Sequence, residues 1–178
     1  MNKMKLGCAL LLVASLGSSV YANDYYVKAT GGINKPDADM NNGNSIGFDN
    51  GGIFNLSIGK KFNAFDVELE YSYGTHDWEN KTTNVKGEGK EKGIFINGYY
   101  NLNLDSKVTP YIGAGIGRLK YNDGYSSETK KSYQGMIGAA YAINEKVDLN
   151  VEYRYRKADY STMDLSSDNY IAGIKYKF

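Results

Sequence analysis

The chain is poor in cysteine, proline, histidine and tryptophan, and these shortages narrow what the protein can be. Among its 178 residues are two prolines, one cysteine (Cys8), one histidine (His76) and one tryptophan (Trp78). A single cysteine excludes an intramolecular disulfide. Nucleophilic hydrolysis generally needs a base beside a serine, and no serine can be placed beside His76. We therefore expect His76, which precedes Asp77, to be a solvated loop residue. We also expect no enzymatic activity, no cofactor and no metal ion.

The chain also lacks an excess of either charge and any long apolar run. It has 21 basic and 20 acidic residues, and this near-neutral balance argues against a nucleic-acid partner. The apolar run from Leu6 to Leu16 is too short for a membrane-spanning helix, which needs roughly 20 residues. The mean hydropathy of −0.50 excludes a helical membrane protein. It does not exclude a membrane β-barrel, because the strands of a barrel are apolar on one face.

The first 22 residues have the pattern of a secretory signal peptide. Lys3 and Lys5 supply the positive region, an apolar segment extends to Leu16, and Val20-Tyr21-Ala22 has the form of a cleavage site. We expect cleavage after Ala22. The remaining residues, 23–178, are then expected to form a single domain.

Eight segments alternate apolar and polar residues with the period of two that is typical of β-strands. The clearest begins at Phe65, where Phe65, Val67 and Leu69 alternate with Asp66, Glu68 and Glu70. The alternation becomes irregular after Gly117, which allows a bulge there. The predicted strands lie near residues 24–34, 52–62, 65–73, 92–103, 108–121, 131–143, 147–157 and 168–178.

The connections between these segments alternate between short turns and long polar stretches. The long stretches, 35–51, 75–91, 122–130 and 158–167, are predicted to be loops. An even number of antiparallel strands with this alternation is typical of a transmembrane barrel. In such a barrel the short turns face the periplasm and the long loops lie outside the cell. The sequence therefore predicts an all-β fold, an eight-stranded antiparallel up-and-down barrel.

A secreted soluble barrel of the lipocalin or streptavidin kind is the alternative, since it shows the same alternation. Aromatic residues near both ends of the apolar faces favour the membrane barrel, because such residues gather at the two membrane–water interfaces. They are Tyr25, Phe65, Tyr71, Tyr73, Tyr153, Tyr155, Tyr170, Tyr176 and Phe178. An arginine or lysine at the bilayer midplane would cost about 2–4 kcal/mol, so the charged faces are expected to point into the lumen.

The lumen charges form the first candidate site. We expect an ion-pair network that fills an interior just wide enough for its side chains. A small gated pore, in which the charged partners exchange, is the alternative. Glycines at 113, 115, 117, 138 and 173 are expected to leave room for the large lumen side chains. The predicted network consists of Glu68, Glu70, Glu152, Arg154 and Arg156.

Two stretches carry a resemblance to a known family. The strand Thr109-Pro110-Tyr111-Ile112-Gly113-Ala114-Gly115-Ile116-Gly117 and the terminal Tyr176-Lys177-Phe178 resemble those of the OmpA-like and OmpX-like small outer-membrane barrels. The Opa-type surface adhesins belong to the same broad, porin-like group. The last strand, with Tyr170, Tyr176 and Phe178 on one face, resembles the assembly signal of such barrels. The chain has no segment matching the peptidoglycan-binding domain of OmpA, so the resemblance implies no periplasmic anchoring role.

This resemblance implies a place in the bacterial outer membrane and a set of partners. They are outer-membrane lipid and lipopolysaccharide, the barrel-assembly machinery through the last strand, and a host surface or serum protein through the outer loops. It implies a structural or adhesive role in which loops on a rigid scaffold make the contact. The candidate loop contacts are Trp78, Lys81 and Lys86.

Overall fold

The computed structural model of the chain describes residues 24–40, 46–80, 85–104, 106–122, 124, 127–159 and 163–178. The expected signal peptide, residues 1–22, and the candidate contact Lys81 lie outside these described residues. Within the described ranges, no helix is both long enough and apolar enough to cross a membrane.

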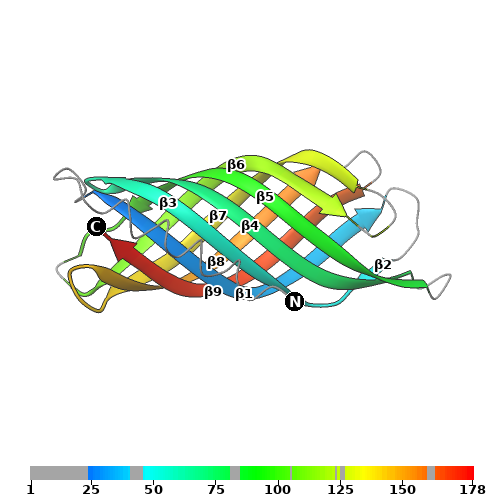
Figure 1. Ribbon diagram of the computed structural model, residues 1–178, viewed down its shortest axis with the longest axis horizontal. Helices are drawn as coiled ribbons and strands as arrows, with labels where there is room; N and C mark the ends of the chain where they lie inside the picture. Colours follow the sequence, from blue (N-terminus) through cyan, green and yellow to red (C-terminus); the bar gives the residue numbers. More distant parts are fainter. Residues whose placement is uncertain are drawn as a thin grey trace, which may run out of the picture.

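The chain folds as a closed antiparallel barrel of eight strands, as predicted (Figure 1). A three-residue strand, β2, is additional, and it pairs with the far end of β4. The strands are β1 (Tyr25–Met40), β2 (Ile46–Phe48), β3 (Gly51–Phe62), β4 (Phe65–Asn80), β5 (Val85–Asn101), β6 (Val108–Asn122), β7 (Ser127–Ala142), β8 (Val147–Asp159) and β9 (Met163–Lys177).

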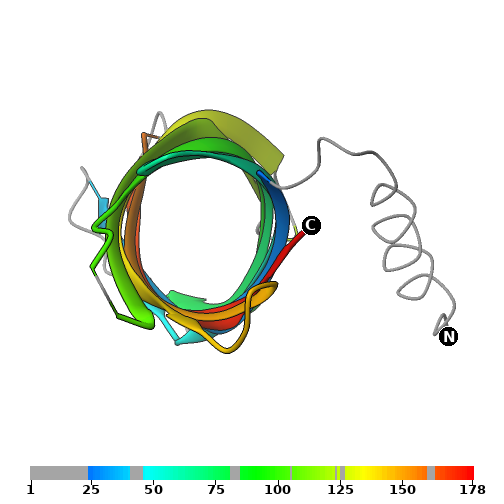
Figure 2. The same ribbon diagram turned by 90° about the vertical axis from the view of Figure 1, so that its left-hand side faces the viewer.

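The barrel closes where the first strand meets the last. Strand β1 pairs antiparallel with β9, from Tyr26 opposite Lys177 to Met40 opposite Met163. Every other barrel strand pairs with its sequence neighbours, and the ring is seen end-on in Figure 2. Along the apolar band, each described barrel strand is paired on both sides, and a sheet needs this closure to cross a bilayer.

The barrel is apolar on the outside and polar on the inside, as the alternation predicts. The outward side chains of Ile96, Ile116 and Val151 are 59%, 62% and 60% exposed, whereas the inward Glu70, Arg154 and Asn97 are at most 1% exposed. A water-soluble barrel would show the opposite arrangement. The outer face therefore suits lipid, and water-seeking groups are gathered in the interior.

Aromatic side chains project outward near both ends of this apolar band. Close to the short turns, Phe65 packs on Tyr100 with ring centroids 5.0 Å apart. Towards the opposite end, Tyr153 packs on Tyr170 at 5.5 Å. Tyrosine suits these levels because its ring is apolar and its hydroxyl group is hydrated.

Most of the four stretches predicted as loops are strand, which corrects that prediction. Strand β4 continues to Asn80 and β5 begins at Val85, and within the stretch predicted as a loop over 75–91 the two are in register from Thr75 opposite Lys90 to Asn80 opposite Val85. The stretches at 35–51, 122–130 and 158–167 are likewise largely taken up by strand ends. Polar composition marks residues that lie outside the bilayer. It does not stop cross-strand pairing, which satisfies backbone donors and acceptors equally well in water.

The irregular alternation after Gly117 has another cause than a bulge. The register of β5 with β6 runs unbroken from Asn101 opposite Tyr111 to Lys90 opposite Asn122. What changes is the polarity of each face. Beyond Gly117 the inward residues become apolar and the outward ones become basic, so the periodicity continues with its sign reversed.

Candidate functional site

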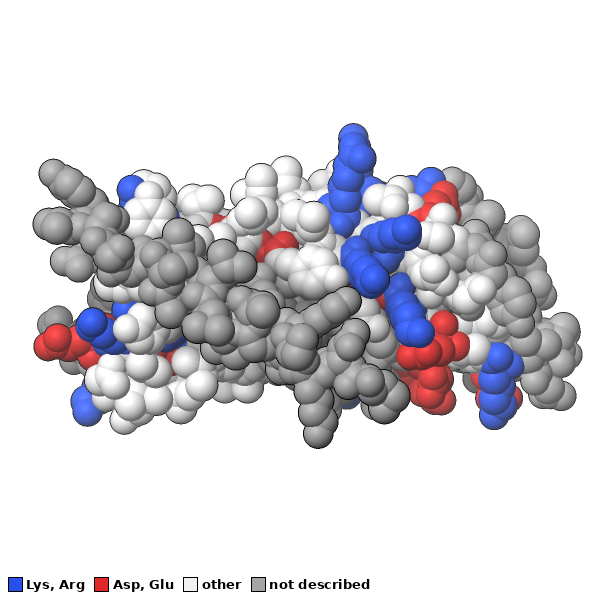
Figure 3. Space-filling view, in the orientation of Figure 1, with Lys and Arg blue, Asp and Glu red and all other residues white. Residues whose placement is uncertain are grey.

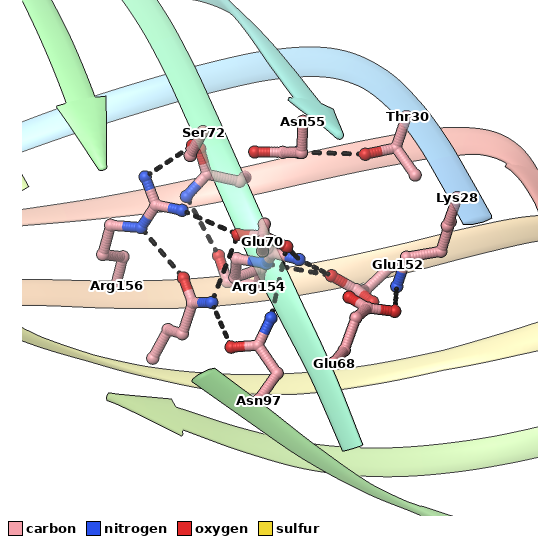
Figure 4. A network of polar contacts seen from close by, with 12 residues as sticks. Lys28, Thr30, Asn55, Glu68, Glu70, Ser72, Asn97, Glu152, Arg154 and Arg156 are labelled. Carbon is pink, nitrogen blue, oxygen red and sulfur yellow. Dashed lines mark hydrogen bonds and ion pairs between the residues drawn. The ribbon is translucent and has the colours of Figure 1, made fainter. Parts of the chain in front are cut away.

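Arg154 stands at the centre of the lumen and binds carboxylates from two strands (Figure 4). From β8 it reaches across to Glu70 on β4, with Nη1 2.6 Å from Oε1 and Nη2 2.9 Å from Oε2. Its Nη2 also lies 2.7 Å from Oε1 of Glu152. The two parallel hydrogen bonds from Arg154 to Glu70 are the strong geometry of an arginine–carboxylate pair. It ties together strands that lie far apart in the sequence.

Arg156 forms a second layer beside this centre. Its Nε donates to Oε1 of Gln134 at 3.0 Å, its Nη1 donates to Oγ of Ser72 at 3.2 Å, and its Nη2 lies 3.6 Å from Oε1 of Glu70. The guanidinium stacks over the ring of Phe95 at 4.4 Å. The strands thus place both arginines against Glu70.

On the periplasmic side of Arg154, Glu68 is held by three donors. Lys28 Nζ lies 2.8 Å from its Oε2, and the hydroxyls of Tyr26 and Tyr99 donate to it at 3.1 and 3.3 Å. Tyr111 donates to Glu152 at 3.1 Å. The cavity left among these groups is only about 10 Å³, near the minimum that one water molecule needs.

The structure brings all five predicted network residues together, and their charges balance once Lys28 is included. Lys28, Arg154 and Arg156 face Glu68, Glu70 and Glu152, which gives three cations and three anions. Such balance matters because a buried charge without a partner costs several kcal/mol. Sequence reasoning left out Lys28, Tyr26, Tyr99 and Tyr111. In the period-two alternation these residues fall on the inward face of their strands, and that position could have identified them.

The outer end of the lumen contains an apolar cluster. Inward side chains of four strands, Phe95, Leu119, Tyr121, Ala158 and Leu165, form one buried cluster. It lies on the far side of Arg156 from the ion-pair centre. The interior is therefore filled in layers, first polar and then apolar.

His76 belongs to this outer end, which corrects the expectation that it is a solvated loop residue. It lies beyond Tyr73 and is 2% exposed. Its Nδ1 is 3.6 Å from Oε1 of Glu91, and its ring stacks on Tyr121 with centroids 5.7 Å apart. Burial lowers the pKa of His76, against the opposing effects of Glu91 and Asp77. His76 continues the inward row of β4, and the loop assignment of this segment hid that parity.

All five glycines named above leave no space for a side chain, and Gly138 is a clear case. A Cβ atom there would lie 2.5 Å from the backbone oxygen of Val151 and 2.6 Å from the Tyr111 ring. We expect Gly138→Ala to lower the free energy of unfolding by about 1–3 kcal/mol, because the ring that binds Glu152 must move.

The measurement is urea unfolding of the refolded barrel, with Gly135→Ala as the matched control. Gly135 lies on the same strand, faces outward and has no heavy atom within 4 Å of a Cβ built on it. The control is expected to stay within about 0.5 kcal/mol of the parent. Equal unfolding midpoints for the two variants would show that the interior tolerates the extra methyl group.

The outer hairpin of β4 and β5 carries the two described contact candidates. Trp78 is half-buried and its indole lies against Gly87, where an added Cβ would be 2.5 Å from the ring. Lys86 is exposed and lies 3.3 Å from Oε1 of Glu79 on the neighbouring strand. Lys90 and Glu88 form a further exposed pair at 2.9 Å. The hairpin surface is thus a mixed-charge, paired sheet, and Figure 1 shows it extending past the other strands.

Comparison with known proteins places this architecture in a family. The model of the outer membrane protein beta-barrel domain matches residues 6–178. Outer membrane protein PagN of Salmonella typhimurium is 29% identical over 107 residues, which cover 52% of this chain and 44% of PagN. The match therefore spans less than half of that relative.

Two solved structures share the fold. Neisserial surface protein A has a TM-score of 0.68 and 24% identity, covering 86% of this chain and 97% of its own. OprG from Pseudomonas aeruginosa has a TM-score of 0.61 and 18% identity, covering 88% and 96%. These two structures show the shared fold. The family-model match over residues 6–178 shows that the chain belongs to the outer membrane protein beta-barrel domain family and lies in the bacterial outer membrane.

Proposed function

We propose that this chain is a non-conducting surface barrel that serves adhesion, with its outer hairpins contacting a host surface or serum protein. The observation that carries the proposal is the β4–β5 hairpin, which stays paired from the membrane to Asn80 opposite Val85. A paired hairpin holds its side chains in fixed positions. This suits a contact surface, because little conformational entropy remains to be lost on binding.

The filled lumen supports the same proposal by leaving little room for transport. The polar layer around Arg154 and the apolar cluster around Leu119 together occupy the interior. Eight strands enclose a space that side chains alone can fill. The alternative function, a small gated pore for ions or solutes, would need the Arg154 contacts to break in each opening. A vestibule of about 120 Å³ on the periplasmic side, lined by Asp148 and Lys177 among others, is the feature that favours it.

Attachment of bacteria tests the adhesive role. The chain is expressed in a non-adherent laboratory Gram-negative strain, and attachment to epithelial monolayers and to immobilised serum proteins is counted. The test variant replaces residues 77–88 with Asn-Gly, a two-residue hairpin turn that keeps the barrel intact. We expect attachment to fall to the level of cells without the protein. Trp78→Ala and Lys86→Ala are expected to give partial losses.

A second trimmed hairpin, with 122–127 replaced by Asn-Gly, is the matched control and is expected to keep attachment. Heat-modifiable migration on gels verifies that each variant is folded. Attachment that survives removal of 77–88 would contradict the assigned hairpin. Discrete conductance steps from the parent protein in a planar bilayer would favour the pore instead.

Two further parts of the proposal concern export and assembly. We propose that residues 1–22 are removed as a signal peptide, leaving 23–178 as the barrel domain. We also propose that the barrel-assembly machinery recognises β9. In support, the predicted signal residues Tyr170 and Tyr176 point outward on this closing strand, and Tyr176 packs on Phe178 with ring centroids 5.4 Å apart.

A further inference from the structure

The outer wall carries a group of basic side chains that neither the interior network nor the hairpin tip explains. It consists of Lys92 on β5, Arg118 and Lys120 on β6, and Lys131 on β7, and we call it the basic cluster. All four are exposed and face outward. Figure 3 shows lysine and arginine side chains gathering over the outer ends of β5 and β6, next to uncharged surface.

The strand register sets these cations directly against one another. Lys92 lies opposite Lys120 on the neighbouring strand, and Arg118 lies opposite Lys131 on the next. Like charges in directly opposed positions destabilise a sheet. Two such pairs side by side are therefore a cost to folding, and a bound anion would remove that cost.

Nearby carboxylates do not neutralise the basic cluster. Glu88 is paired with Lys90 at 2.9 Å, and Glu128 is paired with Lys130 at 2.6 Å. Across the described part of the chain, no aspartate or glutamate oxygen lies within 4.0 Å of the charged nitrogens of the four cluster residues. The cluster thus presents uncompensated positive charge to its surroundings.

The level of the cluster on the barrel identifies those surroundings. Along β6 the outward row reads Ile112, Ala114 and Ile116 before Arg118, so charge follows directly on the lipid-facing band. On β7 the outward-facing Tyr133 is 52% exposed, and it lies between the apolar wall and Lys131. Lys92 lies over the ring of Tyr73 at 6.0 Å from its centroid. Basic residues just beyond an aromatic girdle lie at the depth of lipid headgroups.

We propose that the basic cluster binds the phosphate groups of an anionic glycolipid of the outer leaflet, whose acyl chains lie along the isoleucine rows below. Arginine offers two parallel donors to a phosphate, and the lysines add point charges around it. A lipid suits the site better than a soluble polyanion, because the cluster is continuous with apolar wall. The site lies below the hairpin tip and does not depend on the adhesive function.

Binding of purified lipid A with two phosphates tests this proposal. The refolded protein, in uncharged detergent micelles, is titrated with the lipid and followed by native mass spectrometry. The variant carries Lys92→Gln, Arg118→Gln, Lys120→Gln and Lys131→Gln. Each basic residue near an anionic lipid surface contributes to attraction, so affinity is expected to fall on the order of tenfold or more. Lipid A without phosphates is expected to bind the parent and the variant alike.

A control with the same change of charge separates the cluster from general electrostatics. Lys60→Gln, Lys61→Gln, Lys107→Gln and Lys146→Gln alter the periplasmic end and are expected to leave affinity unchanged. Equal losses in both quadruple variants would overturn the proposal. The proposal would also be overturned if the cluster variant lost binding to a soluble sulfated polysaccharide while its binding to lipid A stayed unchanged. The ligand would then be a polyanion in solution. Lys92→Arg with Lys120→Arg keeps the charge and should keep the affinity, which guards against a folding defect.

Discussion

Replacing Arg154 with alanine is expected to lower the free energy of unfolding by about 3–5 kcal/mol, because Glu152 would lose its buried counter-charge and Glu70 would keep only the more distant Arg156. Glu70 and Glu152 are nearly inaccessible to solvent and both contact this guanidinium. Urea unfolding of the barrel in phospholipid vesicles, followed by the fluorescence of the single tryptophan, measures the loss. Lys107→Ala, at an exposed position beside a short turn, is the control and should change stability by about 0.5 kcal/mol or less.

A compensated variant shows whether the loss comes from stranded charge or from a cavity. Arg154→Met together with Glu70→Gln and Glu152→Gln removes all three charges while keeping much of the volume. It should recover a large part of the stability, because neutral groups cost less to bury than unpaired ions. If the triple variant is as unstable as Arg154→Ala, packing rather than charge explains the effect.

The same Arg154→Ala variant also bears on conduction. A folded parent that is silent in a planar bilayer, with openings appearing only in the variant, would mark Arg154 as the obstruction in a latent pore. Silence in both agrees with a lumen that is blocked in several layers, since the apolar cluster around Leu119 remains in place.

Replacing Ile137 with arginine is expected to cost about 2–4 kcal/mol in a bilayer, because the side chain projects into the hydrocarbon near its middle. Ile137 is 57% exposed and lies midway between Tyr133 and Tyr141 in the outward row of β7, and its β6 neighbour Ile112 is 54% exposed. At so exposed a position in a soluble barrel, the same change would be worth about 0.5 kcal/mol or less. Unfolding in phospholipid vesicles therefore distinguishes the two kinds of barrel.

Thr129→Arg provides the comparison. Thr129 is exposed on β7 opposite Lys120, beyond the apolar band, and arginine there stays in water. This control should unfold with the parent. An Ile137→Arg variant as stable as Thr129→Arg would mean that Ile137 does not face hydrocarbon, and the assigned membrane level would be wrong.

Much of this barrel was predictable because a period of two specifies both the strand and the face. Phe65, Val67 and Leu69 identified the outer wall, and Glu68, Glu70 and Arg154 the interior. Periodicity alone does not say how far strands continue once both faces are polar, so His76 was assigned to a loop. Nor does it say which partners meet across the lumen. The bond from Arg154 to Glu70 joins residues 84 positions apart and depends on the closed ring.

The inward tyrosines show a second reason for incomplete prediction. Tyr26, Tyr99 and Tyr111 look like members of an aromatic girdle by type, yet each donates a hydrogen bond to, or lies beside, a buried carboxylate. At these positions tyrosine does not mark the membrane interface, because a barrel interior needs neutral hydrogen-bond donors as well as cations. Their positions in the alternation would have assigned them to the lumen, whereas their residue type suggested the membrane surface.

The way in which the interior charges are shared among distant strands has a consequence for the folding pathway. Glu68 and Glu70 lie on β4, whereas their cations come from β1 and β8. A partly assembled sheet would hold these groups without their counter-ions, so its inner surface must stay hydrated until the ring closes. Folding is then expected to be slow, since its decisive contacts are remote in sequence. The final expulsion of water, the pairing of β1 with β9 and the neutralisation of the lumen become one cooperative event.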